Sequence, residues 1–254
     1  MEKQLLTDSH CHVCDDMYTQ SPEEIVLEWF ENNGGHLFIV GTNLMDSKIA
    51  VDVSSKYEKV HAIVGVHPLN VLKEAGNVSK VEDLAKTAVA VGEIGLDYHY
   101  EKETKRLQIE VFHKQMQIAQ NLNLPVCIHT RDAMEDTLSV LKQYPNVKGV
   151  VHCYSGSKET AKELVKMGYY IGVGGIVTFK NAREIIETIK EVGVEHIVLE
   201  TDSPYLSPEG FRGKCNKPFM VKYVANKVAE ILNEDVDKIL EITTKNAKKI
   251  YNIS

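Results

Sequence analysis

Residues 88–128, AVAVGEIGLDYHYEKETKRLQIEVFHKQMQIAQNLNLPVCI, contain the pattern on which the fold prediction depends. Apolar runs at Ala88–Ile94 and Pro125–Ile128 flank a stretch with apolar residues at helical spacing over 107–122, interrupted only by the polar Gln115. Short apolar runs are typical of buried strands, and the spacing between them is typical of an amphipathic helix. This stretch therefore predicts a strand, a helix and a second strand.

The same alternation continues along the whole chain. Eight apolar runs predict strands, at Leu5–His10, His36–Val40, His61–Val66, Ala88–Ile94, Pro125–Ile128, Val147–Cys153, Tyr170–Val173 and His196–Leu199. Strands that alternate with helices form a parallel sheet, and eight such units in about 250 residues fit the α/β class as a closed (β/α)8 TIM barrel. A doubly wound open sheet is the alternative. Without solenoid repeats or a linker-like tract, a single domain over residues 1–254 is expected.

Helix boundaries are visible at both ends of the chain. Residues 21–24, Ser-Pro-Glu-Glu, predict an N-cap and first turn, and Gly34 is expected where that helix stops. Two amphipathic helices are predicted after the last strand, one over 221–232 and one over 236–250.

Composition limits the class of protein. The 254 residues are 43% hydrophobic and carry a formal charge of -7, which excludes disorder and shows no broad electropositive surface for nucleic acid. Five scattered cysteines fit a reducing compartment, and Cys11 and Cys14 are expected to be ordinary thiols. No signal peptide is recognisable and no apolar run approaches the roughly 20 residues that cross a bilayer, so a cytoplasmic location and no membrane partner are expected.

Candidate metal ligands follow the predicted strands. His10 and His12 are two positions apart, so on a strand both side chains point the same way and can share a divalent ion. Further candidates end later apolar runs, at Glu93, His129, His152 and Asp202. Strand C-termini converge in a barrel, so six ligands predict two divalent ions, with Glu93 as the bridge. Each histidine alone would equally fit a structural partner, and Asp202 a turn cap.

Other polar residues near the same strand ends are predicted to bind substrate. His67, Tyr98 and Arg131 belong to this group, although Arg131 would also fit a structural ion pair with Asp97. Gly174–Gly175 and residues 212–218, which include Arg212 and Asn216, follow the last two strands, where barrels often bind phosphate. The sequence has neither a G-x-S-x-G elbow nor a dinucleotide fingerprint, which leaves a metal-activated water as the nucleophile.

Five short motifs together resemble the TatD family of metal-dependent hydrolases. They are Asp8-Ser9-His10-Cys11-His12, Gly92-Glu93-Ile94-Gly95-Leu96-Asp97-Tyr98, Ile128-His129-Thr130-Arg131, His152-Cys153-Tyr154-Ser155-Gly156 and Glu200-Thr201-Asp202-Ser203-Pro204-Tyr205. The likeness extends nearly from end to end and includes Gly65-Val66-His67-Pro68, Asn216, Pro218 and Asn246-Ala247. Cys215, where many members carry a basic residue, and His99 depart from the pattern.

The resemblance implies an amidohydrolase-type barrel with a two-metal centre. It implies that His10, His12, Glu93 and Asp202 surround one ion, and that Glu93, His129 and His152 surround the other. Members are usually described as magnesium-dependent deoxyribonucleases, some with 3′ to 5′ exonuclease action, and some relatives as D-aminoacyl-tRNA deacylases.

The expected activity is hydrolysis of DNA phosphodiesters, with two divalent ions (Mg, Mn or Zn) per subunit. Asp202 is expected to act as general base and Glu93 as the bridging catalytic carboxylate. Two alternatives stay open: an ester or amide hydrolase acting on tRNA or a small molecule through the same site, and a metal-bearing binding module without turnover.

Overall fold

The structure is a computed structural model that describes residues 5–100 and 102–254. Within it the sheet contains β1 (Leu6–Cys11), β2 (Gly34–Val40), β3 (Val60–Val64), β4 (Ala90–Asp97), β5 (Val126–Arg131), β6 (Gly149–Val151), β7 (Tyr170–Val173) and β8 (Ile197–Leu199). Strand order in the sheet follows chain order from β1 to β8. The eight predicted strands are therefore present, and they alternate with helices as a (β/α)8 fold requires.

The helices between and after the strands have clear bounds. They are α1 (Pro22–Glu31), α2 (Leu44–Ser54), α3 (Val71–Glu74), α4 (Ser79–Ala85), α5 (Lys105–Leu122), α6 (Met134–Lys142), α7 (Lys158–Lys166), α8 (Arg183–Val192), α9 (Val221–Leu232) and α10 (Val236–Ile250). The two predicted C-terminal helices are thus confirmed as α9 and α10. Among the described residues, no helix combines the length and the apolar composition needed to cross a bilayer.

The chain forms two compact units. Among the described residues, the first consists of 5–39, 153–249 and 254, and the second of 40–100, 102–152 and 250–253. The expectation of a single domain over the whole chain stays a prediction.

In the first unit, β1 pairs in parallel with β2, and β7 pairs in parallel with β8. Every residue of β1 is buried. The predicted start of α1 is confirmed as a capping box, because Ser21 Oγ accepts the backbone N–H of Glu24 and Glu24 Oε2 accepts that of Ser21. Both contacts satisfy N–H groups that the helix itself leaves without partners.

The prediction for Gly34 is wrong in detail. The helix ends at Glu31, with Asn32 as its C-cap, and Gly34 is instead the first residue of β2. A Cβ at Gly34 would lie 2.3 Å from the indole of Trp29, which is fully buried. The glycine is required because Trp29 packs directly on the backbone at this point.

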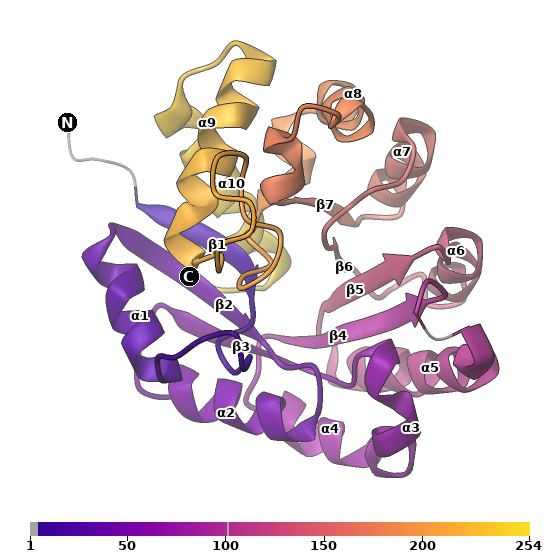
Figure 1. Cartoon of the computed structure of the whole chain (residues 1–254). Coiled ribbons are helices and arrows are strands. Elements are labelled where there is room, and N and C mark those ends of the chain that lie inside the picture. The colour runs from indigo at the N-terminus through magenta and orange to yellow at the C-terminus, as the bar shows by residue number, and fades with distance from the viewer. Residues whose placement is uncertain (1–4, 101) are drawn as a thin grey trace. The chain divides into compact units, whose positions relative to one another are not determined.

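In the second unit, β4 pairs in parallel with both β3 and β5, and β5 pairs in parallel with β6. The helices α2, α4 and α5 run along β3 and β4 (Figure 1). The core of this unit includes Ile63, Val91 and Ile94 from the strands and Phe112 and Met116 from α5, all fully buried.

The strands β4 and β5 extend further than their apolar runs predict. Their pairing continues through Gly95 and His129 to Asp97 and Arg131. The apolar pattern ends before Asp97 because the final residues carry polar side chains, yet the backbone ladder persists. Gly95 permits this, since its φ is +139° and a Cβ there would lie 2.0 Å from the carbonyl oxygen of His129.

Two buried glutamines of α5 hold the ends of β3 and β4. Gln115, the polar interruption in the helical pattern, accepts the N–H of Val66 (2.8 Å) and donates to its carbonyl (3.0 Å). Gln108 does the same for Asp97, at 2.8 and 2.9 Å. Because the two glutamines are seven positions apart, they lie on the same face of the helix. Gln115 fixes the backbone that directly precedes His67. Gln108 fixes the end of β4, the strand that carries Glu93.

Candidate functional site

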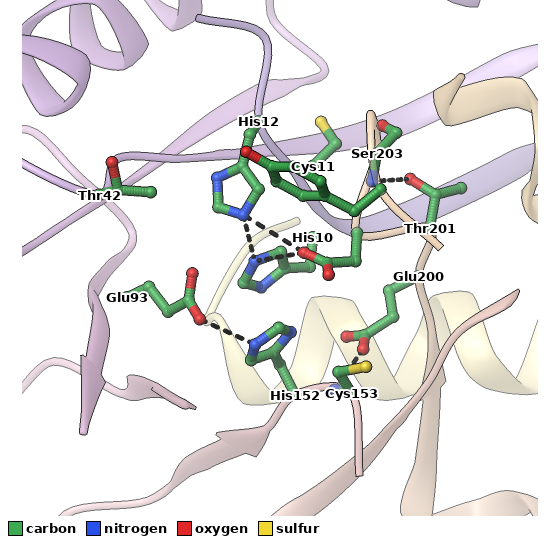
Figure 2. Close-up of polar contacts among 12 residues, drawn as sticks. His10, Cys11, His12, Thr42, Glu93, His152, Cys153, Glu200, Thr201 and Ser203 are labelled. Atoms are coloured by element: carbon green, nitrogen blue, oxygen red, sulfur yellow. Dashed lines mark hydrogen bonds and ion pairs between the residues drawn. The ribbon is translucent and has the colours of Figure 1, made fainter. Parts of the chain in front are cut away.

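One group of possible metal ligands lies in the first unit. The Nε2 atoms of His10 and His12 are 3.1 Å apart, and Asp202 Oδ1 lies 3.6 Å from the first and 3.3 Å from the second. Figure 2 shows the two imidazoles side by side. His10 belongs to β1, His12 follows that strand, and Asp202 follows β8. The three side chains offer two nitrogens and a carboxylate oxygen within 4.8 Å of one another.

Backbone hydrogen bonds bring β1 and the segment after β8 together. The N–H of His12 donates to Ser203 O (2.8 Å), and the N–H of Asp202 donates to His10 O (3.0 Å). Asp202 has a left-handed backbone with a φ of 53°. Aspartate tolerates this region better than most residues, so the turn can present its carboxylate toward the histidines.

The buried carboxylate of Asp8 supports the same segment. It accepts the hydroxyl of Thr201 (2.6 Å), the N–H of Thr201 (3.0 Å) and the N–H of His10 (3.2 Å). Burial raises the pKa of Asp8 well above its usual value, although these three hydrogen bonds oppose the shift. Asp8 begins the motif Asp8-Ser9-His10-Cys11-His12, but its contacts with Thr201 are visible only in the structure.

A second group of possible ligands lies in the second unit and contains His67, Glu93 and His129. Glu93 Oε1 lies 2.8 Å from His129 Nδ1 and 3.4 Å from His67 Nε2. Glu93 is buried within β4, and His129 lies within β5, rather than after the ends of these strands. The sequence placed His67 among the substrate contacts, whereas here its ring lies in a group able to hold an ion.

His152 belongs to the same neighbourhood of the second unit. Its Nε2 lies 2.8 Å from Glu93 Oε1, as the dashed line in Figure 2 marks, and 3.4 Å from His129 Nδ1. It directly follows β6. Glu93 therefore has three imidazoles around one carboxylate oxygen, from His67, His129 and His152.

Asp97 holds the opposite side of the His129 ring. Its Oδ2 lies 3.0 Å from His129 Nε2, and its side chain is only 1% exposed. Burial raises the pKa of Asp97, but the hydrogen bonds from His129 and from the backbone of Tyr100 and His99 outweigh it, so the pKa lies below its usual value. Burial lowers the pKa of His129, but its hydrogen bonds with Asp97 and Glu93 outweigh this effect, so the pKa lies above its usual value. With Nε2 directed at Asp97, Nδ1 is the nitrogen that faces Glu93.

Glu200 is a further residue that the sequence did not single out. Its side chain is fully buried in the first unit, and Oε1 accepts the backbone N–H of Cys153 at 2.5 Å, a contact drawn in Figure 2. Cys153 has a φ of 44°, a left-handed conformation uncommon for this residue type. The Glu200 carboxylate thus fixes the left-handed backbone of Cys153. The signal for Glu200 in the sequence was an acidic residue two positions before Asp202.

The predicted substrate-binding residues have different surroundings. Tyr98 is nearly buried and donates its hydroxyl to Asp136 (2.8 Å). Arg131 is exposed and lies over the ring of Tyr100 instead of pairing with Asp97. Their contacts with substrate stay predictions.

The loop after β8 is held together from inside. Asn216 is fully buried, and its side-chain amide donates to the carbonyls of Thr201 (3.0 Å) and Tyr205 (2.7 Å). Arg212 lies 4.6 Å from the ring centre of Phe179. Substrate contacts of Arg212 and Asn216 stay predictions, but the structure adds a bracing role for Asn216.

The two departures from the family pattern lie outside the ligand groups. Cys215 is half-buried, and burial raises the pKa of its thiol. The Nδ1 of His99 lies 3.0 Å from Asp132 Oδ2, and the His99 ring meets the Tyr100 ring edge-on.

The donor chemistry of both groups fits divalent cations. Imidazole nitrogens with a carboxylate oxygen suit zinc or manganese, and carboxylates also suit magnesium. Paired carboxylate and imidazole groups are buried at little cost when an ion or proton compensates them. The residues present in both groups therefore fit divalent metal ions.

The comparisons with known proteins agree with these features. A family model described as TatD related DNase matches residues 7–252. The uncharacterized metal-dependent hydrolase YabD of Bacillus subtilis is 37% identical over 255 residues, which cover 98% of this chain and 100% of that protein. The uncharacterized metal-dependent hydrolase YcfH of Escherichia coli K12 is 37% identical over 258 residues, covering 98% of this chain and 96% of that protein.

A solved structure extends the likeness to the fold. The crystal structure of YJJV, a TatD homologue from Escherichia coli K12, has a TM-score of 0.91 at 26% identity and covers 98% of each chain. The predicted (β/α)8 barrel of the amidohydrolase-like type is therefore confirmed, and the open doubly wound alternative is wrong. On the matched family model and these relatives, the chain belongs to the TatD family of metal-dependent hydrolases.

Proposed function

We propose that this protein is a metal-dependent deoxyribonuclease that hydrolyses phosphodiester bonds of DNA. The observation that carries the proposal is the Glu93 carboxylate, which faces three imidazoles within 3.4 Å in the second unit. Such a cluster has the donor types that hydrolytic metal centres use, which supports the proposal. The description of the matching family model as a DNase supports the choice of DNA as substrate.

The candidate ligands divide into the two groups described above. We assign His10, His12 and Asp202 to one ion, and Glu93, His129 and His152 to the other, with His67 beside Glu93. Divalent ions held there would polarise the phosphoryl oxygens and lower the pKa of a coordinated water. Magnesium, manganese and zinc are the ions to test.

The side chains would then divide the remaining work. Asp202 accepts the proton of the attacking water, since its side chain is 14% exposed and so can contact a solvent molecule. Asp97 keeps His129 in one orientation through Nε2. Arg131 and Arg212 offer guanidinium groups for the phosphates, a local attraction that the formal charge of -7 does not supply.

The test is hydrolysis of 5′-labelled single-stranded DNA by metal-stripped protein to which magnesium, manganese or zinc is restored. We expect shortening that depends on the metal and that His129→Ala abolishes. A ladder that starts at the 3′ end would establish 3′ to 5′ exonuclease action.

D-Aminoacyl-tRNA is tested beside DNA, because the same donor set could serve an ester substrate. Deacylation without DNA cleavage by fully metallated protein would overturn the nuclease proposal in favour of an ester hydrolase. No turnover of either substrate would overturn it in favour of a binding module.

A further inference from the structure

An exposed tyrosine follows the strand that carries Glu93. Tyr100 is 60% exposed, whereas Tyr98, two positions earlier, is 8% exposed. Single exposed aromatic residues are common on protein surfaces and do not by themselves indicate a binding site. The contacts of Tyr100 distinguish it.

A guanidinium group lies over the ring of Tyr100. The Cζ of Arg131 is 4.7 Å from the ring centre, within the range of a cation–π contact. Arg131 and His129 are two positions apart on β5, so their side chains leave the same face of the strand. The Arg131 side chain is exposed, and among the described residues no carboxylate forms an ion pair with its guanidinium.

The backbone of Tyr100 is fixed to the second ligand group through one carboxylate. Asp97 Oδ1 accepts the N–H of His99 (2.9 Å) and that of Tyr100 (3.0 Å). The other oxygen of Asp97 contacts His129 Nε2 at 3.0 Å. Asp97 is itself held by Gln108, through both its N–H and its carbonyl. The tyrosine therefore occupies a defined position relative to His129 and Glu93.

A second aromatic ring contacts Tyr100 in a T-shaped arrangement. The His99 ring centre lies 4.7 Å away at an interplanar angle of 88°, and His99 is held by Asp132. Tyr100 thus combines a supported backbone, an edge-on aromatic contact and a stacked cation while it remains largely exposed. A flat cationic surface of this kind matches a planar ring that carries a neighbouring negative charge.

We infer that Tyr100 and Arg131 form a stacking platform for a nucleobase of a single-stranded nucleic acid substrate. A nucleobase offers a π-face to the aromatic ring and the guanidinium plane, and its phosphate is attracted by Arg131. Stacking of this kind tolerates any base, so the platform gives affinity without sequence preference. The inference rests on the proposed function and specifies the part of the substrate that the second unit holds.

The test separates stacking from charge. Binding of two fluorescent oligonucleotides of equal length, oligo-dT and an abasic strand, is measured by anisotropy with magnesium present. The protein carries Asp202→Asn so that the strand is not cleaved. Adding Tyr100→Ala should weaken oligo-dT binding about tenfold and leave the abasic strand unchanged. Tyr100→Phe should restore oligo-dT binding, because phenylalanine keeps the ring.

The matched control is Leu72→Ala. Leu72 is 69% exposed in the same unit, so its removal deletes a comparable exposed apolar side chain. It should leave both affinities unchanged.

The outcomes distinguish the platform from the nuclease proposal. If the unmodified protein cleaves DNA but Tyr100→Ala weakens neither strand, or weakens both equally, the platform is wrong and the nuclease proposal stands. If the metallated parent protein does not cleave DNA and its Asp202→Asn variant does not bind DNA, both the platform and the nuclease proposal are overturned.

Discussion

Asp97 and His129 face each other across 3.0 Å, carboxylate Oδ2 to imidazole Nε2, on the paired strands β4 and β5. The contact fixes which ring nitrogen of His129 turns toward Glu93. Carboxylates of this kind orient metal-binding histidines in many hydrolases and keep the ring in the required tautomer. The relationship depends on a strand that extends beyond its apolar run.

Replacing Asp97 is expected to weaken metal binding. In Asp97→Ala the ring of His129 loses the partner of Nε2, and the affinity for a divalent ion should fall roughly 10- to 100-fold. Titration of metal-stripped protein with zinc or manganese measures this directly. Asp83→Asn, which alters an exposed carboxylate paired with Lys86, is the control. An unchanged affinity in Asp97→Ala would show that the contact does not orient His129.

Asp202→Asn is expected to abolish turnover while the fold persists. The amide retains the size of the side chain but is a poor proton acceptor and a weaker ligand, so kcat should fall by at least about 100-fold. Far-UV circular dichroism and the melting temperature should stay near those of the parent, because Asp202 is partly exposed in a turn. Activity close to that of the parent would rule out Asp202 as the general base.

Gly95→Ala is expected to destabilise the second unit. The new Cβ would lie 2.0 Å from the His129 carbonyl oxygen at a φ of +139°, so the β4–β5 ladder must shift. The cost should be about 2 kcal/mol or more, measured by denaturant unfolding. Gly76→Ala, where no atom lies within 4 Å of the added Cβ, should change stability little. Equal stability of the two variants would contradict the tight approach at Gly95.

The ion pair between Glu28 and Lys217 should make stability depend on pH. The Nζ of Lys217 lies 2.9 Å from Glu28 Oε2. Burial raises the pKa of Glu28, but the hydrogen bonds from Lys217 and Gln20 outweigh it and lower the pKa below its ordinary value of 4.5. The stabilisation is therefore complete above pH 4.5 and is lost as the pH falls through the lower folded-state pKa.

Lys217→Met checks this sign. Unfolding free energies measured between pH 7 and pH 3 should show the variant less stable at neutral pH, with the difference from the parent shrinking in acid. A difference that stays constant across this range would contradict a contribution from the Glu28 carboxylate.

The strand and helix pattern could be read from the sequence because each element has its own periodicity. Tyr170–Val173 was predicted with the bounds that the structure has, since its apolar run and its ladder coincide. The ends of β4 and β5 were predicted too early, because pairing of backbone groups continues where the side chains are already polar. The prediction that Gly34 ends the helix is wrong, because a glycine is needed there to leave room for Trp29, and local sequence signals do not encode that contact.

The candidate ligands were recognisable because histidine and carboxylate residues are unusual after apolar runs. The sequence predicts substrate binding for His67. Its position beside Glu93 depends on the segment after β3, which Gln115 fixes through the backbone of Val66. Asp8 and Glu200 were not singled out, because a buried carboxylate reveals its partners only when distant segments meet.

The sequence by itself determined the alternation of strands and helices, the family, and the residue types able to bind metal, because these follow from local periodicity and short motifs. Only the tertiary structure decided which nitrogen of His129 faces Glu93, and that Asp97 contacts His129 rather than Arg131. It also decided that Tyr100 stays exposed beneath the Arg131 guanidinium. Those features depend on side-chain directions set by packing and strand pairing, which no local pattern specifies.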